Sequence, residues 1–241
     1  MRYEFNWAML LQQPYSEWIV DGVLTTIHLA LLGWVMALAL GIPVGICRIA
    51  NSYFLRLSSG VYVEVFRSIP PLVQLFLWFY VFPLVLPEDS RDWWNTLDSA
   101  PYLTALIGIS LFTSARIAEQ VRSAISAIPR GQFNAALSTG LTPVQVYRHV
   151  ITPYAIRIML PALSSEFLSI FKNTSLALTI GVLEITGVAR KIESWSFKGI
   201  EAYSVASLTY VGTTIAVIVF MTWMEKLAHI PGLIDNSKRG L

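Results

Sequence analysis

Five long apolar stretches, separated by short polar segments, dominate the pattern of hydrophobic and polar positions along the chain. Each is close to the ~20 residues that a helix needs to cross the hydrocarbon core of a bilayer. The predicted spans are residues 22–47, 60–86, 102–124, 155–183 and 203–226. The pattern therefore predicts an all-α polytopic membrane protein with about five transmembrane helices.

Polar residues and prolines interrupt two of the predicted spans. A proline inside a helix removes a backbone hydrogen bond and clashes with the preceding turn, which bends or breaks the helix. We therefore expect the second and fourth spans to be kinked or partly interfacial rather than straight. The interruptions are Arg67, Pro70, Pro71 and Pro83 in the second span and Pro161 and Lys172 in the fourth.

Small residues recur at every fourth position of the first span, at Gly33, Ala37, Gly41 and Gly45. Such a stripe lets two helix backbones approach closely inside a membrane. It predicts tight packing of the first span against another helix.

The composition supports a chain surrounded mostly by lipid. Hydrophobic residues make up 55% of the 241 residues and charged residues 13%, whereas soluble domains carry about 25% charged residues. The net charge of +2 is too small to favour nucleic-acid binding. The single cysteine, Cys47, excludes an intramolecular disulfide. The three histidines are scattered, so the sequence predicts no metal site.

The distribution of Lys and Arg predicts the orientation in the membrane. With the N-terminus outside, nine basic residues fall on the inner side and five on the outer side, which agrees with the excess of positive charge in cytoplasmic segments. Residues 1–21 lack the pattern of a cleaved signal peptide, so we expect an outer N-terminal segment there. Residues 22–228 then form the transmembrane domain, and residues 229–241 form a cytoplasmic tail.

A polar loop at residues 126–153, on the predicted inner side, has the sequence signals of two short helices. An Ala-rich helix is expected over residues 132–139, with Gly140 as its left-handed cap. Thr142, a proline at the next position and Gln145 form a capping box that predicts a second helix to about residue 151. We expect Pro153 to prevent this helix from merging smoothly into the next span. Composition alone allows either a docking element or a solvated connector.

The 126–153 loop resembles the EAA loop of bacterial ABC-importer permeases. Asn134, Ala135 and Ala136 occupy the Glu-Ala-Ala positions, with Asn134 in place of the Glu, and Gly140 and Pro153 fall in register with the Gly and Pro of that pattern. The missing Glu bears on any charge contact with an ATPase, whereas the expected shape of the loop is unchanged.

Further matches extend over most of the chain. They include residues 62–74 (with Glu64, Arg67, Pro70, Pro71 and Gln74 as structural motif residues), Ala118-Glu119 with Arg122, residues 129–132 and residues 172–176. Together they resemble the polar-amino-acid (histidine/glutamine-type) branch of ABC-importer permeases. The resemblance is greatest to the inner-membrane permease subunits of glutamate/aspartate importers.

This resemblance implies a transport subunit rather than an enzyme, so no catalytic residues are expected. The implied partners are ATP-binding cassette ATPase subunits that bind ATP and Mg, a homologous or identical second permease subunit, and an extracytoplasmic amino-acid-binding protein. The implied location is the bacterial inner membrane, and the implied mechanism is alternating access for polar, and in particular acidic, amino acids. In agreement, the sequence lacks the G-x-x-x-x-G-K-[ST] phosphate loop, so we expect no cofactor in this subunit.

Charged residues inside the third span are candidates for the substrate pathway, because a charge at mid-membrane costs ~2.5–3.5 kcal/mol on insertion scales. Arg116, Glu119 and Gln120 share one helix face by their spacing. Glu119 is able to neutralise Arg116 or Arg122, which is a structural role. Alternatively, an unpaired Arg116 would bind a substrate carboxylate. For Arg67, snorkelling or pairing with Glu64 is favoured.

The fourth span carries a mostly polar stripe, which is expected to face protein or water rather than lipid. Lys172, together with Glu166, is a candidate for holding the carboxylate and ammonium of an amino acid. Lys172 is alternatively a partner for a carboxylate of the second subunit. The other candidates on this span are Ser169, Asn173 and Ser175.

Two rival interpretations remain from the residues. A self-contained secondary transporter or channel is disfavoured by the EAA-like loop and by the absence of a visible inverted repeat. An intramembrane enzyme is disfavoured because the spans contain no Ser/His pair, His-Glu-x-x-His motif or paired aspartates.

Overall fold

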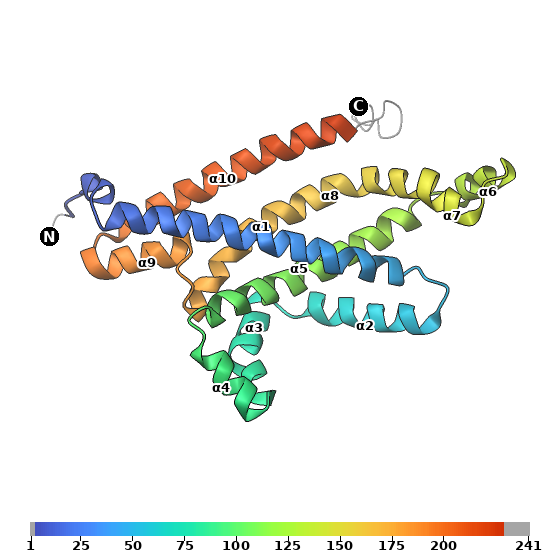
Figure 1. The fold of residues 1–241 in the computed structure, drawn as a ribbon. Helices are drawn as coiled ribbons and strands as arrows, with labels where there is room; N and C mark the ends of the chain where they lie inside the picture. The colour runs from blue at the N-terminus through green and yellow to red at the C-terminus, as the bar shows by residue number, and fades with distance from the viewer. Residues whose placement is uncertain (1–2, 229–241) are drawn as a thin grey trace.

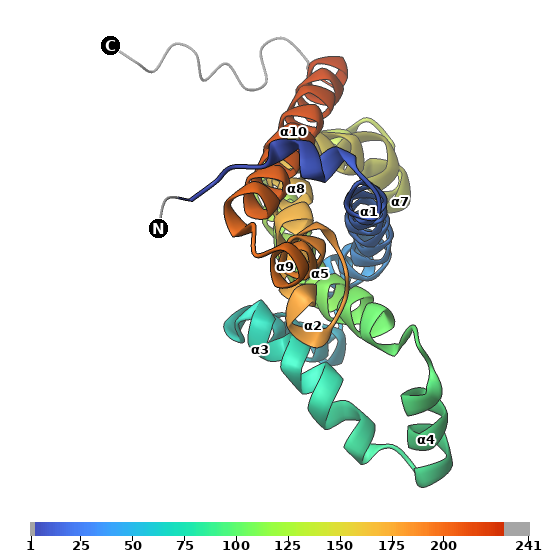
Figure 2. The same cartoon turned by 90° about the vertical axis from the view of Figure 1, so that its left-hand side faces the viewer.

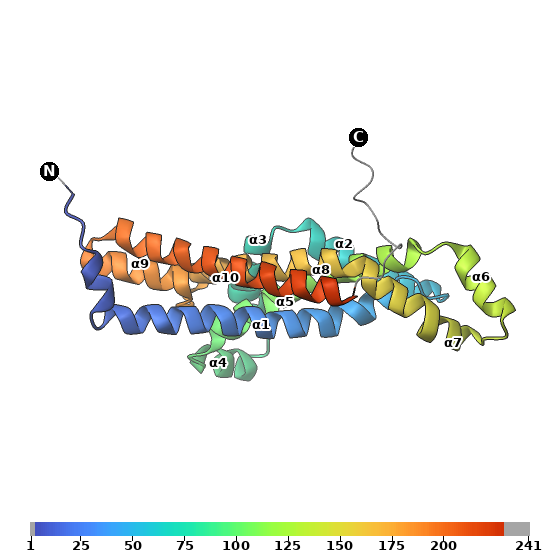
Figure 3. The same ribbon diagram turned by 90° about the horizontal axis from the view of Figure 1, so that it is seen from above.

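Helices make up all the regular secondary structure of residues 3–228, which is the part of the chain that the computed structural model describes. Four long helices run along the length of the molecule (Figures 1 and 3): α1 (Tyr15–Cys47), α5 (Ala100–Ser126), α8 (Thr152–Asn173) and α10 (Gly199–Ala228). The predicted tail, residues 229–241, lies outside the described residues.

The number of spans agrees with the sequence prediction. Four stretches are long and apolar enough to cross a membrane, namely Tyr15–Cys47, Ala100–Ser126, Pro143–Ile180 and Gly199–Met224, and a bent helix pair supplies a fifth if it counts as one span. The first helix begins at Tyr15, seven positions before the predicted span and inside the segment expected to be an outer extension.

The bent pair corresponds to the second predicted span, and the expected kink is confirmed. It consists of α2 (Tyr53–Ser68) and a second arm, Pro71–Val85, at 103° to it. This arm comprises α3 (Pro71–Phe76), a π turn (η2, Leu77–Val81) and a 3-10 turn (η3, Phe82–Val85).

The cause of the bend lies in the two prolines that start α3. Ile69, before Pro70, adopts an extended conformation (φ −91°, ψ 128°), as sterics require of a residue preceding proline. The side-chain amide of Gln74 then donates hydrogen bonds to the carbonyl oxygens of Phe66 (2.7 Å) and Ile69 (2.8 Å). Carbonyls that the break would leave without partners are thereby satisfied.

The closest helix packing joins α1 to α5 through the stripe of small residues. A Cβ atom on Gly41 would lie 2.7 Å from the carbonyl oxygen of Ser114, and one on Gly45 would lie 2.6 Å from the Cβ of Val121. Larger residues at these positions would push the helices apart. The predicted role of the stripe is therefore confirmed, and α5 becomes the central helix of the bundle, with most of its length buried.

The 126–153 loop forms one tip of the molecule (Figure 1). Its first helix, α6, spans Arg130–Ser138, and Gly140 follows with φ +88°, which confirms the left-handed cap. The capping box of Thr142 and Gln145 starts α7 (Pro143–Val146), also as predicted.

The expected interruption at Pro153 is wrong. A π turn, η4 (Tyr147–Ile151), joins α7 to α8 without a break, and Pro153 lies in the first turn of α8. Pro153 has no amide hydrogen to donate, and the π turn directly before it absorbs the local change of hydrogen-bond register. The second helix of the loop and α8 are consequently parts of one helical run, Pro143–Ile180.

The opposite tip contains the N-terminal segment and α9 (Ile185–Ser196), as Figures 1 and 3 show. Glu201 at the start of α10 accepts hydrogen bonds from the Tyr3 hydroxyl and the Asn6 amide, which ties the N-terminal segment to the bundle. Helix α4 (Glu88–Thr96) projects away from the bundle (Figure 2) and has no buried residue.

We predict that Gly45→Val destabilises the protein, because two methyl groups would enter a contact that has no room for a Cβ. Overpacking of this kind costs ~1–3 kcal/mol. The midpoint of thermal unfolding in detergent should fall by several degrees. Gly60→Val is the matched control, since a Cβ on that α2 glycine meets nothing within 4 Å. Equal midpoints for the two variants would show that the close contact is not needed.

Candidate functional site

A cavity of about 360 Å³ opens between α2, α5 and α8. Its volume falls in the range of ~300–1,000 Å³ that is typical of small-molecule sites. Charged and polar side chains from all three helices line it: Arg67 from α2, Phe112, Arg116, Glu119 and Gln120 from α5, and Glu166 from α8.

An ion pair between α5 and α8 forms the centre of the cavity wall. Arg116 donates from Nε to Oε2 of Glu166 (2.7 Å) and from Nη2 to Oε1 (2.8 Å), which is a bidentate arrangement. Gln120 adds a third donor, Nε2, 3.0 Å from Oε1 of Glu166. The Glu166 side chain is only 6% exposed, whereas that of Arg116 is 44% exposed. The guanidinium carbon also lies 5.7 Å from the centre of the Phe112 ring.

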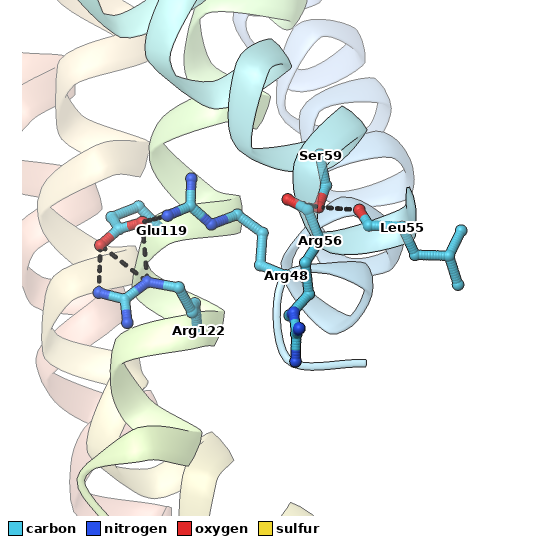
Figure 4. A network of polar contacts seen from close by, with 6 residues as sticks. All are labelled: Arg48, Leu55, Arg56, Ser59, Glu119 and Arg122. Carbon is cyan, nitrogen blue, oxygen red and sulfur yellow. Dashed lines mark hydrogen bonds and ion pairs between the residues drawn. The ribbon is translucent and has the colours of Figure 1, made fainter. Parts of the chain in front are cut away.

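A second charged cluster ties α5 to the end of α1 (Figure 4). Both carboxylate oxygens of Glu119 accept hydrogen bonds from Arg122, one turn later on α5, at distances of 2.5–3.1 Å. Nη2 of Arg48, directly after α1, lies 3.3 Å from Oε2 of the same carboxylate. Glu119 is thus shared by two arginines, so it is not available to neutralise Arg116.

The α2 helix runs beside this cluster and is also shown in Figure 4. Ser59 on α2 donates a hydrogen bond back to the Leu55 carbonyl oxygen (2.5 Å), and the side chain of Arg56 is exposed. Within residues 3–228, Arg56 forms no ion pair closer than 4.0 Å. Of the three arginines in this region, Arg48 and Arg122 are therefore paired with Glu119, and Arg56 is not.

The structure decides between the alternatives for the charged residues of α5. Arg122 is the partner of Glu119, as one alternative predicted. An unpaired Arg116 is wrong, because Glu166, fifty positions later, neutralises it. Sequence spacing within one helix does not reveal such a partner, since the contact depends on how α5 and α8 pack.

Arg67 lies on the cavity, but the expected pair with Glu64 does not form. Both side chains are exposed, and among the described residues neither has an ion-pair partner within 4.0 Å. Arg67 therefore contributes a positive charge to the cavity that no described carboxylate compensates by direct contact.

The predicted polar stripe of α8 lies on the surface of this chain rather than in the cavity. Lys172 is exposed, and Glu166 is engaged by Arg116 instead of by Lys172. The hydroxyls of Ser169 and Ser175 donate to carbonyl oxygens of their own helical segment, at 2.8 and 2.7 Å. Asn173 is partly exposed at the end of α8. The cavity thus includes Arg116, Glu119 and Glu166 of the predicted pathway residues, and the other four lie outside it.

The loop residues singled out by the EAA-like pattern lie at the surface. Asn134, Ala135 and Gly140 are exposed, and Ala136 and Pro153 are partly exposed. A hollow of about 270 Å³ lies beside α6 and the π turn and is lined by Phe133, Asn134 and Tyr147, among others. This tip therefore offers small and polar side chains for contact with another molecule.

Sequence reasoning missed three members of the charged clusters. Phe112 has a signal in the sequence, because Phe112, Arg116 and Gln120 recur at intervals of four and so share one face of α5. The same spacing places Gln120 on this face but does not reveal its contact with Glu166. Arg48 carried no signal beyond its position after the first span, because its contact with Glu119 depends on the packing of α1 against α5.

Comparison with known proteins identifies the type of membrane protein that shares this architecture. Residues 31–229 match the family described as binding-protein-dependent transport system inner membrane component. The chain is 37% identical over 241 residues to the glutamate/aspartate import permease protein GltJ of Escherichia coli (strain K12), covering 96% of this chain and 98% of that protein.

Two further similarities concern amino-acid transport. The glutamine transport system permease protein GlnP of Escherichia coli (strain K12) is 28% identical over 227 residues, which cover 94% of this chain and 99% of that protein. A crystal structure of an amino acid ABC transporter with histidines superposes with a TM-score of 0.81 at 25% identity, covering 93% of this chain and 99% of the other.

We predict that the Arg116–Glu166 pair contributes to stability as a unit. Glu166→Gln and Arg116→Gln should each lower the free energy of unfolding by ~1–3 kcal/mol, because each leaves a charge without its partner. The double variant should lose less than the sum, with a coupling of at least ~1 kcal/mol measured by thermal unfolding. The exposed pair Arg91–Glu88, 4.0 Å apart on α4, is the control and should show almost no coupling. Additive losses at Arg116 and Glu166 would contradict the prediction.

Proposed function

Since this chain belongs to the family of binding-protein-dependent transport system inner membrane components and is an amino-acid ABC importer permease, we propose that its cargo is the acidic amino acids glutamate and aspartate. The identity to the glutamate/aspartate permease (37%) exceeds that to the glutamine permease (28%), which supports this choice. The observation that carries the proposal is the cavity lined by Arg116, since a guanidinium nitrogen donates a charge-assisted hydrogen bond to a carboxylate.

The charges around the cavity favour an anion. Two carboxylates, Glu119 and Glu166, are surrounded by four arginines, namely Arg48, Arg67, Arg116 and Arg122. Arg116 uses Nε and Nη2 on Glu166, so its third nitrogen, Nη1, is left to donate to a ligand. An acidic amino acid brings two carboxylates and one ammonium, and its net negative charge would offset part of the surplus.

The α8 stripe is proposed to line the route beyond the cavity. Ser169, Lys172, Asn173 and Ser175 are polar or charged on a helix long and apolar enough to span the membrane. Such side chains are stable at membrane depth where they face water or another subunit. A second permease subunit, identical or homologous, would cover this face, so that substrate passes between polar surfaces rather than lipid.

The 126–153 loop is proposed to be the contact with a separate ATPase that binds ATP and Mg. Its exposed tip with Asn134, Ala135, Ala136 and Gly140 supports this role, and Pro153 marks the start of α8. ATP binding would draw the ATPase subunits together and move the loops. Because the loop continues into α8 as one helix, the movement would reach Glu166 and drive alternating access.

This role fixes the proposed topology in a bacterial inner membrane. The loop tip must face the cytoplasm, where ATP is available, and the opposite tip with α9 and the N-terminal segment must face outward, where a binding protein delivers substrate. The N-terminus would then lie outside and the C-terminus inside, in agreement with the excess of Lys and Arg on the inner side.

The decisive experiment is uptake by proteoliposomes that contain this chain with its ATPase and permease partners. With ATP on one side and binding protein on the other, labelled glutamate and aspartate should accumulate, and neutral amino acids should accumulate at least ~10-fold less. Arg116→Met, which keeps a long apolar stem but no charge, should reduce uptake of acidic amino acids more than that of any neutral amino acid. Equal losses would indicate an assembly role for Arg116, and uphill accumulation without an ATPase would exclude the importer.

We further predict that Gly140→Glu uncouples transport from ATP hydrolysis. At φ +88° a side chain is strained by ~1 kcal/mol or more, and the new charge would lie on the loop tip. ATP turnover should no longer respond to substrate, and uptake should fall by at least ~10-fold.

Gly140→Asn is the matched control for this prediction, because asparagine tolerates the left-handed conformation. It should retain most of the coupled uptake. Normal uptake by the Glu variant would show that the cap of α6 is not part of the ATPase contact.

A further inference from the structure

The amide oxygen of Gln120 is a buried acceptor without a donor. Among the described residues, Gln120 Oε1 is shielded from solvent and has no hydrogen-bond partner. Leaving such an atom unpaired costs ~1–3 kcal/mol, and native structures rarely tolerate it without a reason. Two other side-chain oxygens share this condition, on Gln74 and Thr104. Gln120 differs from both because it lines the cavity of the charged site.

Glu166 fixes which end of the Gln120 amide meets it. An ionised carboxylate only accepts hydrogen bonds, and Glu166 already receives two from Arg116. The amide must therefore direct its NH₂ group to Glu166, as the 3.0 Å contact from Nε2 shows. A flipped amide would set two acceptors against each other. The oxygen is consequently turned away from Glu166. The carboxylate of the Arg116–Glu166 ion pair thus fixes the orientation of the amide and leaves its oxygen as a free acceptor.

We propose that Gln120 is a specificity-determining residue that recognises the ammonium group of the substrate through its amide oxygen. This inference rests on the proposed function of the cavity as an amino-acid site. The substrate carboxylate would bind Arg116, and the ammonium would donate a hydrogen bond to Gln120 Oε1. An ammonium group has three donors and no acceptor, so it matches the one unpaired acceptor of this cavity wall.

Access to the oxygen requires a rearrangement of side chains. The Gln120 oxygen is covered in the unliganded chain, and the cavity also contains two exposed, long side chains, Arg67 and Arg116. Among the described residues Arg67 has no ion-pair partner within 4.0 Å, so its side chain is free to turn toward a bound carboxylate. The inference therefore includes a coupling within the site, in which anion binding to the arginines exposes the acceptor for the ammonium.

The test compares L-glutamate with glutarate, which has the same two carboxylates but no ammonium group. Equilibrium binding of both is measured on the purified permease–ATPase complex in lipid nanodiscs, without binding protein. The wild type should bind glutamate about tenfold more tightly than glutarate, as expected for one hydrogen bond to a charged group. Gln120→Met should reduce this ratio to about one. The ratio cancels effects that act on carboxylate binding alone.

Two further variants separate recognition from general damage. Gln120→Glu keeps an acceptor oxygen and loses the donor to Glu166, so its ratio should equal or exceed that of the wild type. Gln74→Met is the matched control, because Gln74 also has an unpaired buried oxygen but does not line the cavity. Its ratio should stay at the wild-type value even if the yield of complex falls.

The possible failures can be told apart. A wild-type ratio near one, or a tenfold ratio that survives in Gln120→Met, overturns the role of Gln120 while the importer function stands. A ratio that collapses in both Gln120 variants also overturns it, because the donor to Glu166 and not the oxygen would then be responsible. A wild-type complex that binds neither ligand removes the cavity as a substrate site and this inference with it.

Discussion

The close approach of α1 and α5 is the constraint on which the rest of the structure depends. Lipid offers no hydrophobic driving force between helices, so their association relies on intimate packing. At Gly41 and Gly45 the backbone of α1 lies too near Ser114 and Val121 to admit a Cβ. This contact buries one face of α5. The remaining face, with Arg116 and its neighbours, must then turn toward α2 and α8, which is where the cavity forms.

Ion pairs between helices hold the bundle together in addition to this packing. A lone charge at membrane depth is costly, and both carboxylates of α5 and α8 at the cavity are held by arginines: Glu166 by Arg116 and Glu119 by Arg122 and Arg48. The two pairs differ in function under the proposed mechanism. The Glu119 cluster fastens α1 to α5, two helices that are already tightly packed. The Arg116–Glu166 pair instead bridges α5 and α8, so any relative movement of these helices changes the geometry of the site.

Helix α8 connects this site to the loop tip through a helical run that contains no irregular segment. The capping box of Thr142 and Gln145 fixes the start of the helical run, and the π turn at Tyr147–Ile151 carries it into α8. π turns are frequent at functional positions because they place an extra residue in a turn at some cost in hydrogen-bond geometry. A displacement of the tip by an ATPase would therefore be transmitted along one helix to Glu166, and from there through Arg116 and Gln120 to the substrate. The Arg116–Glu166 ion pair would then take part both in substrate recognition and in the coupling of transport to ATP hydrolysis.

The sequence by itself determined the helical membrane fold, the kink at Pro70 and Pro71, the glycine stripe, and the caps at Gly140 and Thr142, because each depends on residues close together in the chain. It also indicated the polar face of α5, since that follows from helical spacing. Only the tertiary structure decided that Arg116 meets Glu166, that Arg48 meets Glu119, and that the Gln120 oxygen has no donor. It also decided that α7 runs into α8 past Pro153. The physical reason is the same for the two ion pairs and for the unpaired oxygen: each depends on how separate helices pack, and spacing along one helix carries no information about its neighbours.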